Sequence, residues 1–166
     1  MAFEIRPVQV RDYGGLGHVT AEVYAVVYPP IEEARKAVRE MRDVTARVAE
    51  AETTFVAVEP GDGKVLGGVS FVLSGNKHAN VARPGEGEFR LLAVDPAARG
   101  QGVGQALVQA CLDRGAELGL ERVVLLTQED MLEAQRLYDR MGFKRVTDRD
   151  WEPVPGVRLW AYAFEV

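Results

Sequence analysis

The stretch that decides the fold is residues 88–143, which read EFRLLAVDPAARGQGVGQALVQACLDRGAELGLERVVLLTQEDMLEAQRLYDRMGF. Short apolar runs alternate in it with segments of helical periodicity. This order predicts a strand, a glycine-rich turn, a helix, a second strand and a second helix. We therefore predict an α/β fold with a mixed, mostly antiparallel central sheet and helices on both of its faces.

The turn of this stretch carries glycine at every second position, at Gly100, Gly102 and Gly104, with Arg99 in front of them. Glycine allows backbone N–H groups to approach a ligand closely, and a helix N-terminus adds about half a positive charge. Arg99 adds a charge-assisted contact. The turn is therefore predicted to bind phosphate or another anion.

Two common phosphate motifs do not fit this turn. The dinucleotide fingerprint G-x-G-x-x-G fails because its third glycine would fall on Gln105 or Leu107. The nucleotide P-loop fails because no Gly-Lys-Ser/Thr follows any of the glycines. The pattern that remains is R-x-x-G-x-G after a strand that ends LLAVDP.

This pattern resembles the GNAT superfamily of acyl-CoA-dependent N-acyltransferases. A second motif continues the resemblance, because Ala134, Leu137, Tyr138, Gly142 and Phe143 are spaced as in the family's A-x-x-L-Y-x-x-x-G-F helix. The two motifs lie a helix and a strand apart, as that family requires. The resemblance implies one GNAT-like acetyltransferase domain over residues 1–166.

The resemblance also implies the donor, acetyl-CoA, and where it binds. The turn would hold the coenzyme A pyrophosphate, and the backbone of the strand entering it would bind the pantetheine and acyl group. No metal is implied. The residues expected to bind the donor are Leu92, Ala93, Val94, Arg99, Gly100, Gln101, Gly102, Val103, Gly104 and Gln105.

Tyr138 is the first candidate catalytic residue. A phenol loses its proton only near pH ~10, so it stays protonated and is able to give a proton to a departing thiolate. The resemblance assigns this position that role toward the coenzyme A sulfur. The plainer alternative is a packing aromatic with its hydroxyl at the surface.

Glu88 is the second candidate. An alkyl ammonium has a pKa near ~10, so an attacking amine must first lose a proton. A carboxylate near the acceptor attracts the cation and assists that loss, directly or through water. Residues 74–87, a long predicted loop, precede Glu88 and could border the acceptor pocket. A solvent-facing glutamate and a mobile connecting loop are the alternatives.

Met131 departs from the family pattern, which often has asparagine at this position. A polar contact to the pantetheine arm or to the start of the helix is therefore missing or replaced. Asp130 and Glu133 form a D-x-x-E pattern that predicts a capping box at the helix start.

Composition narrows the class of protein. The chain has 166 residues, 47% of them hydrophobic and 27% charged, as in an ordinary globular protein. A net charge of −5 argues against a nucleic-acid binder and mildly favours a cationic partner. The lone Cys111 suits a reducing compartment. With no signal segment and no apolar run of about 20 residues, the expected location is cytoplasmic and away from membranes.

The remaining elements follow from periodicity and turn residues. Expected strands are residues 3–8, 53–58, 65–73, 88–94, 122–127, 144–151 and 157–164, and expected helices begin near Asp12 and Ile31 and cover 102–118 and 130–141.

The predicted reaction is transfer of an acetyl group to a primary amine, by direct attack in a ternary complex. The acceptor is a small molecule or a peptide that the sequence does not identify. The alternative is an acyl-CoA-binding sensor or regulatory module without catalysis. The oligomeric state stays open as well, and a homodimer is among the states that the resemblance implies.

Overall fold

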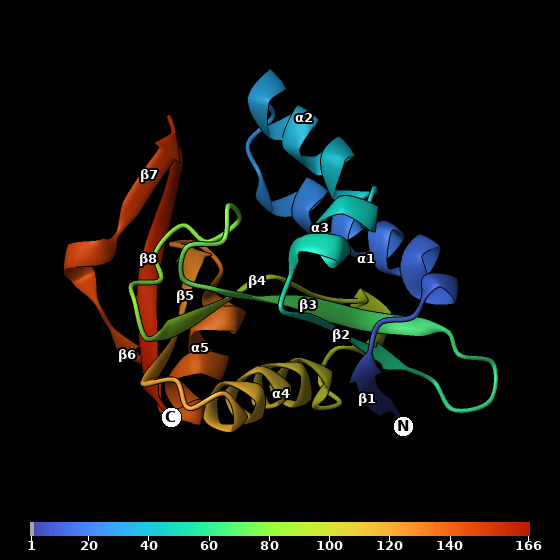
Figure 1. Cartoon of the computed structure of the whole chain (residues 1–166). Helices are drawn as coiled ribbons and strands as arrows, with labels where there is room; N and C mark the ends of the chain where they lie inside the picture. The colour runs from blue at the N-terminus through green and yellow to red at the C-terminus, as the bar shows by residue number, and fades with distance from the viewer. Residues whose placement is uncertain (1) are drawn as a thin grey trace.

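In the computed structural model, which describes residues 2–166, eight strands form one sheet in the order β1-β2-β3-β4-β5-β8-β6, and β7 pairs with β8 (Figure 1). The strands are β1 (Glu4–Pro7), β2 (Thr53–Val58), β3 (Val65–Leu73), β4 (Glu86–Val94), β5 (Arg122–Gln128), β6 (Lys144–Arg145), β7 (Trp151–Val154) and β8 (Val157–Glu165). Only β4 and β5 are parallel. The predicted mixed, mostly antiparallel sheet is confirmed.

Helices cover both faces of this sheet. They are α1 (Tyr13–Val27), α2 (Glu32–Met41), α3 (Thr45–Glu50), α4 (Val103–Glu117) and α5 (Leu132–Met141). Figure 1 shows α1, α2 and α3 on one face and α4 and α5 on the other. The larger core lies on the second face, where Leu107, Cys111 and Phe89 are buried between α4, α5 and the sheet. Cys111 is fully buried.

The helix predicted from Ile31 onward is wrong in one respect, because it is broken into α2 and α3. The Asp43 carboxylate accepts a hydrogen bond from the Thr45 amide (3.1 Å), and this local bond starts a new helix. Val44 remains buried after the break and packs against Val56 and Val58. The apolar residues that follow Ile31 are therefore spaced to reach the core from two short helices and not from one continuous helix.

The expected strand over residues 144–151 is also interrupted. A short 3-10 helix, Thr147–Arg149, follows β6, and the chain then returns to pair as β7. Arg145 closes the interruption with two hydrogen bonds of 2.7 Å to the Asp150 carboxylate. This ion pair joins residues five positions apart in the sequence. Because both residues are charged, the pair leaves no hydrophobic periodicity from which the interruption could be predicted.

The sheet opens between β4 and β5, and this opening positions the site. The two strands pair only at their starts, where Glu86, Gly87 and Glu88 face Arg122, Val123 and Val124. Beyond them β4 carries a bulge, at which Leu91 has a φ of 55° and the register with β3 shifts. The second half of β4 therefore has one side without a strand partner.

Candidate active site

The glycine-rich turn (residues 99–105) begins the site on the α4 side. Gly100 has a φ of 76° and Gly102, the N-cap of α4, has a φ of 85°. These left-handed conformations favour glycine. Nothing lies within 4 Å of the position of a Cβ at either residue, so the space in front of the backbone is open.

The amides of residues 100–105 in the turn have no acceptor within residues 2–166. The N–H groups of residues 100–105 make no hydrogen bond to backbone or side chain, and the first bond into α4 runs from the Ala106 amide to the Gly102 carbonyl (3.0 Å). Arg99 is exposed beside them. Six successive unpaired donors at the positive end of a helix form an arrangement that fits a diphosphate group.

The unpaired side of β4 leads into this turn. The Asp95 amide donates to the Leu66 carbonyl in β3 (2.7 Å), so by strand alternation the polar groups of Ala93 also face β3. The backbone groups of Leu92 and Val94 consequently face the opening between β4 and β5. The Tyr24 hydroxyl already donates to the Leu92 carbonyl (3.2 Å). Of the three strand residues expected to contact the donor, Leu92 and Val94 are the two whose backbone is available.

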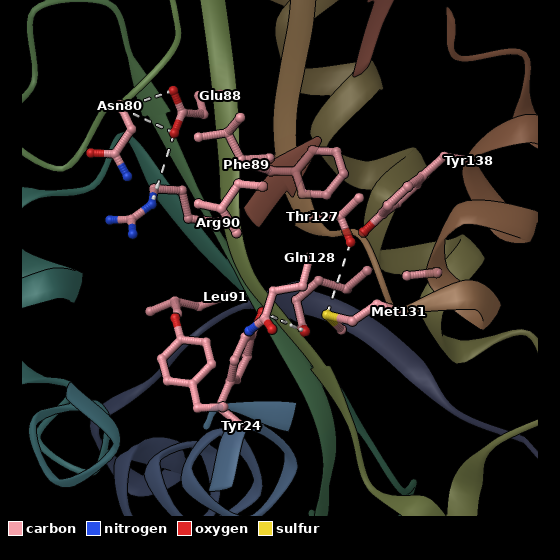
Figure 2. A pocket seen from close by; sticks show the side chains of 15 residues that line it. Tyr24, Asn80, Glu88, Phe89, Arg90, Leu91, Thr127, Gln128, Met131 and Tyr138 are labelled. Atoms are coloured by element: carbon pink, nitrogen blue, oxygen red, sulfur yellow. Dashed lines mark hydrogen bonds and ion pairs between the residues drawn. The ribbon is translucent and has the colours of Figure 1, made fainter. Parts of the chain in front are cut away.

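A cavity of about 90 Å³ lies in the opening, and we call it the β4–β5 pocket. Its polar lining comes from α1, β4, β5, α5 and the β3–β4 loop (Figure 2). The side chains concerned are Tyr24, Tyr28, Asn80, Glu88, Arg90, Thr127, Gln128 and Tyr138. Tyr138 and Glu88, which the sequence singled out separately, are thus brought to one pocket.

Tyr138 is 4% exposed and belongs to an aromatic cluster. Its ring centroid lies 5.8 Å from Phe89, 5.6 Å from Phe143 and 5.8 Å from Tyr162. Figure 2 shows the hydroxyl directed toward Thr127, and within residues 2–166 it has no hydrogen-bond partner. Burial raises the pKa of this phenol, so it holds its proton over the whole neutral range. The alternative of a hydroxyl at the outer surface is wrong.

Glu88 is 1% exposed, so the alternative of a solvent-facing side chain is also wrong. Its Oε1 accepts hydrogen bonds from the amides of Asn80 (3.0 Å), Val81 (2.8 Å) and Ala82 (2.9 Å). Its Oε2 accepts only the Asn80 amide (3.1 Å) and lies 3.8 Å from Arg90 Nε. Oε1 is therefore saturated, while Oε2 keeps a free lone pair.

The β3–β4 loop (residues 74–85) is fastened to its surroundings at several points. The Asn76 side chain donates to the Glu50 carbonyl (2.7 Å), and Lys77 and His78 both contact the Glu50 carboxylate. Together with Glu88, these contacts place Asn80 in the wall of the β4–β5 pocket. The loop therefore borders this pocket, as the sequence suggested.

The start of α5 differs from the expected capping box. Helix α5 begins at Leu132 with Met131 as its N-cap, and no side chain caps it. Asp130 lies one residue too early for that role. The Gln135 side chain instead ties α5 to the end of β5 by donating to the carbonyls of Gln128 (3.1 Å) and Glu129 (2.9 Å).

Sequence reasoning missed several polar residues of the β4–β5 pocket. Arg90 interrupts the apolar run of β4, and this interruption was a signal that the prediction did not use. Tyr24 and Tyr28 lie toward the end of the helix that begins near Asp12, and Asn80 lies within the predicted loop of residues 74–87. Their common position depends on the tertiary fold and shows in no local pattern.

Comparison with known proteins gives the family. The model of the Acetyltransferase (GNAT) family matches residues 20–143. A mycothiol acetyltransferase of Mycobacteroides abscessus is 46% identical over 61 residues, or 37% of this chain and 21% of that protein. One of Sanguibacter keddieii is 38% identical over 108 residues, or 63% and 33%. These alignments span only about a fifth to a third of the length of these relatives.

Solved structures share the fold over the whole chain. A GNAT-family acetyltransferase of Staphylococcus aureus aligns with a TM-score of 0.76 at 14% identity, covering 99% of both chains. A PaiA N-acetyltransferase of Thermoplasma acidophilum, solved in complex with coenzyme A, aligns with a TM-score of 0.73 at 17% identity over the full length of both. No helix within residues 2–166 has the length and apolar character to cross a membrane. From the family match, the sheet that opens between β4 and β5 and the glycine-rich turn, we conclude that this chain belongs to the GNAT acetyltransferase family.

Proposed function

We propose that this protein transfers an acetyl group from acetyl-CoA to a primary amine in a ternary complex. The observation that supports this most strongly is the continuous path from the turn to the β4–β5 pocket. Unpaired amides of residues 100–105 would hold the pyrophosphate, and the open side of β4 runs from there to Tyr138 and Glu88. Acetyl-CoA supplies the acetyl group as an activated thioester.

The chain's own groups would divide the chemistry between them. The outward N–H groups of Leu92 and Val94 are the donors available to polarise the thioester carbonyl, in the manner of an oxyanion hole. Tyr138 would give its proton to the leaving sulfur, and its burial in the aromatic cluster keeps the hydroxyl in one place. Holding donor and amine together would supply further rate through proximity.

Glu88 would receive the proton of the attacking amine. Its free lone pair is on Oε2, on the side of Arg90, and the carboxylate lines the pocket while being nearly inaccessible to bulk solvent. A bridging water is therefore the expected carrier of the proton. The fully bonded Oε1 would hold the β3–β4 loop in place during this step.

The test is a turnover assay that follows release of free thiol from acetyl-CoA over a panel of primary amines. Acyl transfer is expected with at least one amine, together with coenzyme A binding measured by calorimetry. Coenzyme A binding without turnover for any amine would favour the alternative, a non-catalytic acyl-CoA sensor. Absence of both would reject the donor site itself.

A further inference from the structure

Arg90 has its guanidinium in the wall of the β4–β5 pocket without a hydrogen-bond acceptor. Its nearest carboxylate oxygen is Glu88 Oε2, which lies 3.8 Å from Nε and is outside hydrogen-bonding range. No other acceptor within residues 2–166 bonds this group. Figure 2 shows Arg90 beside Glu88 and Asn80, on the same side of the pocket as Tyr24. Its planar donors are therefore available to a ligand.

Arg47, on α3, is a second arginine in this region and is unusual in its burial. Its Nη2 donates to the Thr20 hydroxyl (3.1 Å), but Nε and Nη1 are buried and have no partner. Burial, with a smaller contribution from the charge of Arg90, lowers the pKa of this guanidinium to about 10. Buried charged groups in proteins are ordinarily paired with a group of opposite charge. The surroundings of the Arg47 guanidinium therefore lack a negative group.

Tyr24 joins the two arginines to the pocket. It lines the cavity, and its ring packs edge-on against Tyr28 with the ring centroids 5.6 Å apart. Burial raises the pKa of the Tyr24 phenol, although the charges of Arg90 and Arg47 both oppose that rise. Tyr28 also lines the cavity; burial raises the pKa of its phenol, and the charge of Arg90 opposes that rise. Both phenols stay protonated and neutral.

Charge in this part of the pocket does not balance. Arg90 lines the pocket, and Arg47 lies close enough for the charges of the two guanidinium groups to interact. Among residues 2–166, the one carboxylate that lines the pocket is Glu88, whose Oε1 already accepts three backbone amides. The carboxylate whose charge acts on Arg47 is that of Asp43, which is exposed. This local excess of positive charge is opposite in sign to the whole chain, which carries −5.

We propose that the acceptor amine carries a carboxylate, which binds the guanidinium of Arg90 while the nearby charge of Arg47 strengthens the binding. This inference rests on the proposed function and names the substrate class of the same pocket, amino acids. A guanidinium binds a carboxylate through two parallel hydrogen bonds, which fixes the orientation of the acceptor. The volume of about 90 Å³ suits the small polar head of such a molecule.

The experiment compares acceptors of matched shape that carry either a carboxylate or a carboxamide, with rates referred to the concentration of neutral amine. The probes are the α-amino acids, β-alanine and 4-aminobutanoate, each beside its own carboxamide. The best acid should exceed its carboxamide in kcat/KM by about tenfold to a hundredfold, the range of a charge-assisted hydrogen bond. Equal rates, or a preference for the carboxamide, would overturn the inference.

Variants assign the preference to residues. Arg90→Gln should reduce the ratio of acid to carboxamide to near one, because the acid should lose much more rate than the carboxamide, and Arg90→Lys should restore part of the ratio. Arg47→Met should reduce the ratio to a smaller extent. Arg11→Gln removes an exposed arginine ahead of α1 and should leave the ratio unchanged. An equal loss for acid and carboxamide in Arg90→Gln would overturn the inference, since it would indicate only a structural role.

Calorimetry separates this inference from the proposed function. If no amine is acetylated, the proposed function fails, but the binding of each acid and carboxamide is still measured on the protein saturated with coenzyme A. Tighter binding of an acid, lost in Arg90→Gln, would support the carboxylate site even then. Equal binding of acid and carboxamide would reject it.

Discussion

The glycine-rich turn and the β4–β5 pocket present different parts of the chain to the ligands that we propose for them. The turn offers backbone amides of six successive residues, 100–105, which no other group in residues 2–166 occupies. The β4–β5 pocket offers side chains from α1, β4, β5, α5 and a loop. The binding groups of a local backbone site are set by the geometry of the turn. In a site built from distant side chains, by contrast, a single substitution is enough to change which acceptor binds.

The largest effect is expected from a negative charge placed in the turn. Gly102→Asp puts a carboxylate at the N-cap of α4, where a unit charge at about 5 Å from an anion costs roughly 3 kcal/mol at an effective dielectric constant of 20. Coenzyme A affinity should fall by about a hundredfold or more, measured by calorimetry. The stabilisation of about 2.7 kcal/mol that a hundredfold ligand excess gives the wild type should disappear.

Two controls separate charge from backbone strain. Gly102→Asn keeps the left-handed conformation tolerable without a charge and should retain most of the affinity. Gly119→Asp makes the same change at the other end of α4, where φ is also positive at 72° and the surroundings are open. It should bind coenzyme A as the wild type does. Unchanged affinity in folded Gly102→Asp would contradict the anion site.

The turn could be predicted from sequence because all of its determinants are neighbours in the chain. Three alternate glycines behind an arginine, between a strand and a helix, specify both the conformation and the free amides. The same is true of the order of strands and helices within residues 88–143, which the structure reproduces with ends shifted by one or two residues.

The second expected effect concerns Tyr138, which lines the β4–β5 pocket and is proposed to protonate the sulfur of the coenzyme A that the turn would bind. Tyr138→Phe keeps the ring in its aromatic cluster and removes the proton donor, so kcat should fall by about a hundredfold while coenzyme A affinity stays near that of the wild type. Rapid-mixing kinetics would measure the chemical step. Tyr162→Phe is the matched control, because Tyr162 is as deeply buried in the same cluster. Equal rates for both variants would mean that another group protonates the thiolate.

The acceptor side could not be predicted in the same way. Arg47, Tyr24 and Arg90 are separated by long stretches of sequence, and they come together because α1 packs on β4 and α3 packs on the neighbouring β3. The net charge of −5 indicated a cationic partner, but it averages over the whole surface. Arg90 in the pocket, with the charged Arg47 near it, gives a local excess of positive charge that runs against this indication.

The third prediction tests the two tasks assigned to Glu88. Glu88→Gln keeps the size but places an amide NH₂ against backbone donors, so the loop should loosen. If Glu88 also receives the amine proton, kcat/KM should fall by roughly tenfold near pH 7 and recover partly toward pH ~10, where more amine is neutral. A loss that is the same at every pH would leave Glu88 only the task of positioning the loop.

The smallest effect is expected at the far end of the β3–β4 loop, where Glu50 contacts Lys77 and His78. Glu50→Gln removes the charge but leaves the bond from Asn76 to the Glu50 carbonyl (2.7 Å) intact. Amide exchange at residues 80–82 should therefore rise only roughly twofold to fivefold, the scale of a partly exposed ion pair. Hydrogen exchange read by mass spectrometry would measure it. Glu32→Gln, which breaks the exposed pair with Arg39 on α2, should leave this loop unchanged.

The pH dependence of the same contact gives the sign of its contribution. The hydrogen bond from Lys77, aided by His78, holds the pKa of Glu50 below its usual value. A carboxylate with a lowered pKa in the folded state stabilises the fold above its unfolded pKa of about 4.3, and the contribution is lost as the pH falls through the folded value. After correction for intrinsic exchange, the wild-type loop should be better protected than Glu50→Gln at about pH 5, and the two should converge as the pH falls below the lowered pKa of Glu50. A difference that persists at the lower pH would show that packing and not charge holds the loop in place. The β3–β4 loop would then depend on ionisation as little as the backbone of the glycine-rich turn does.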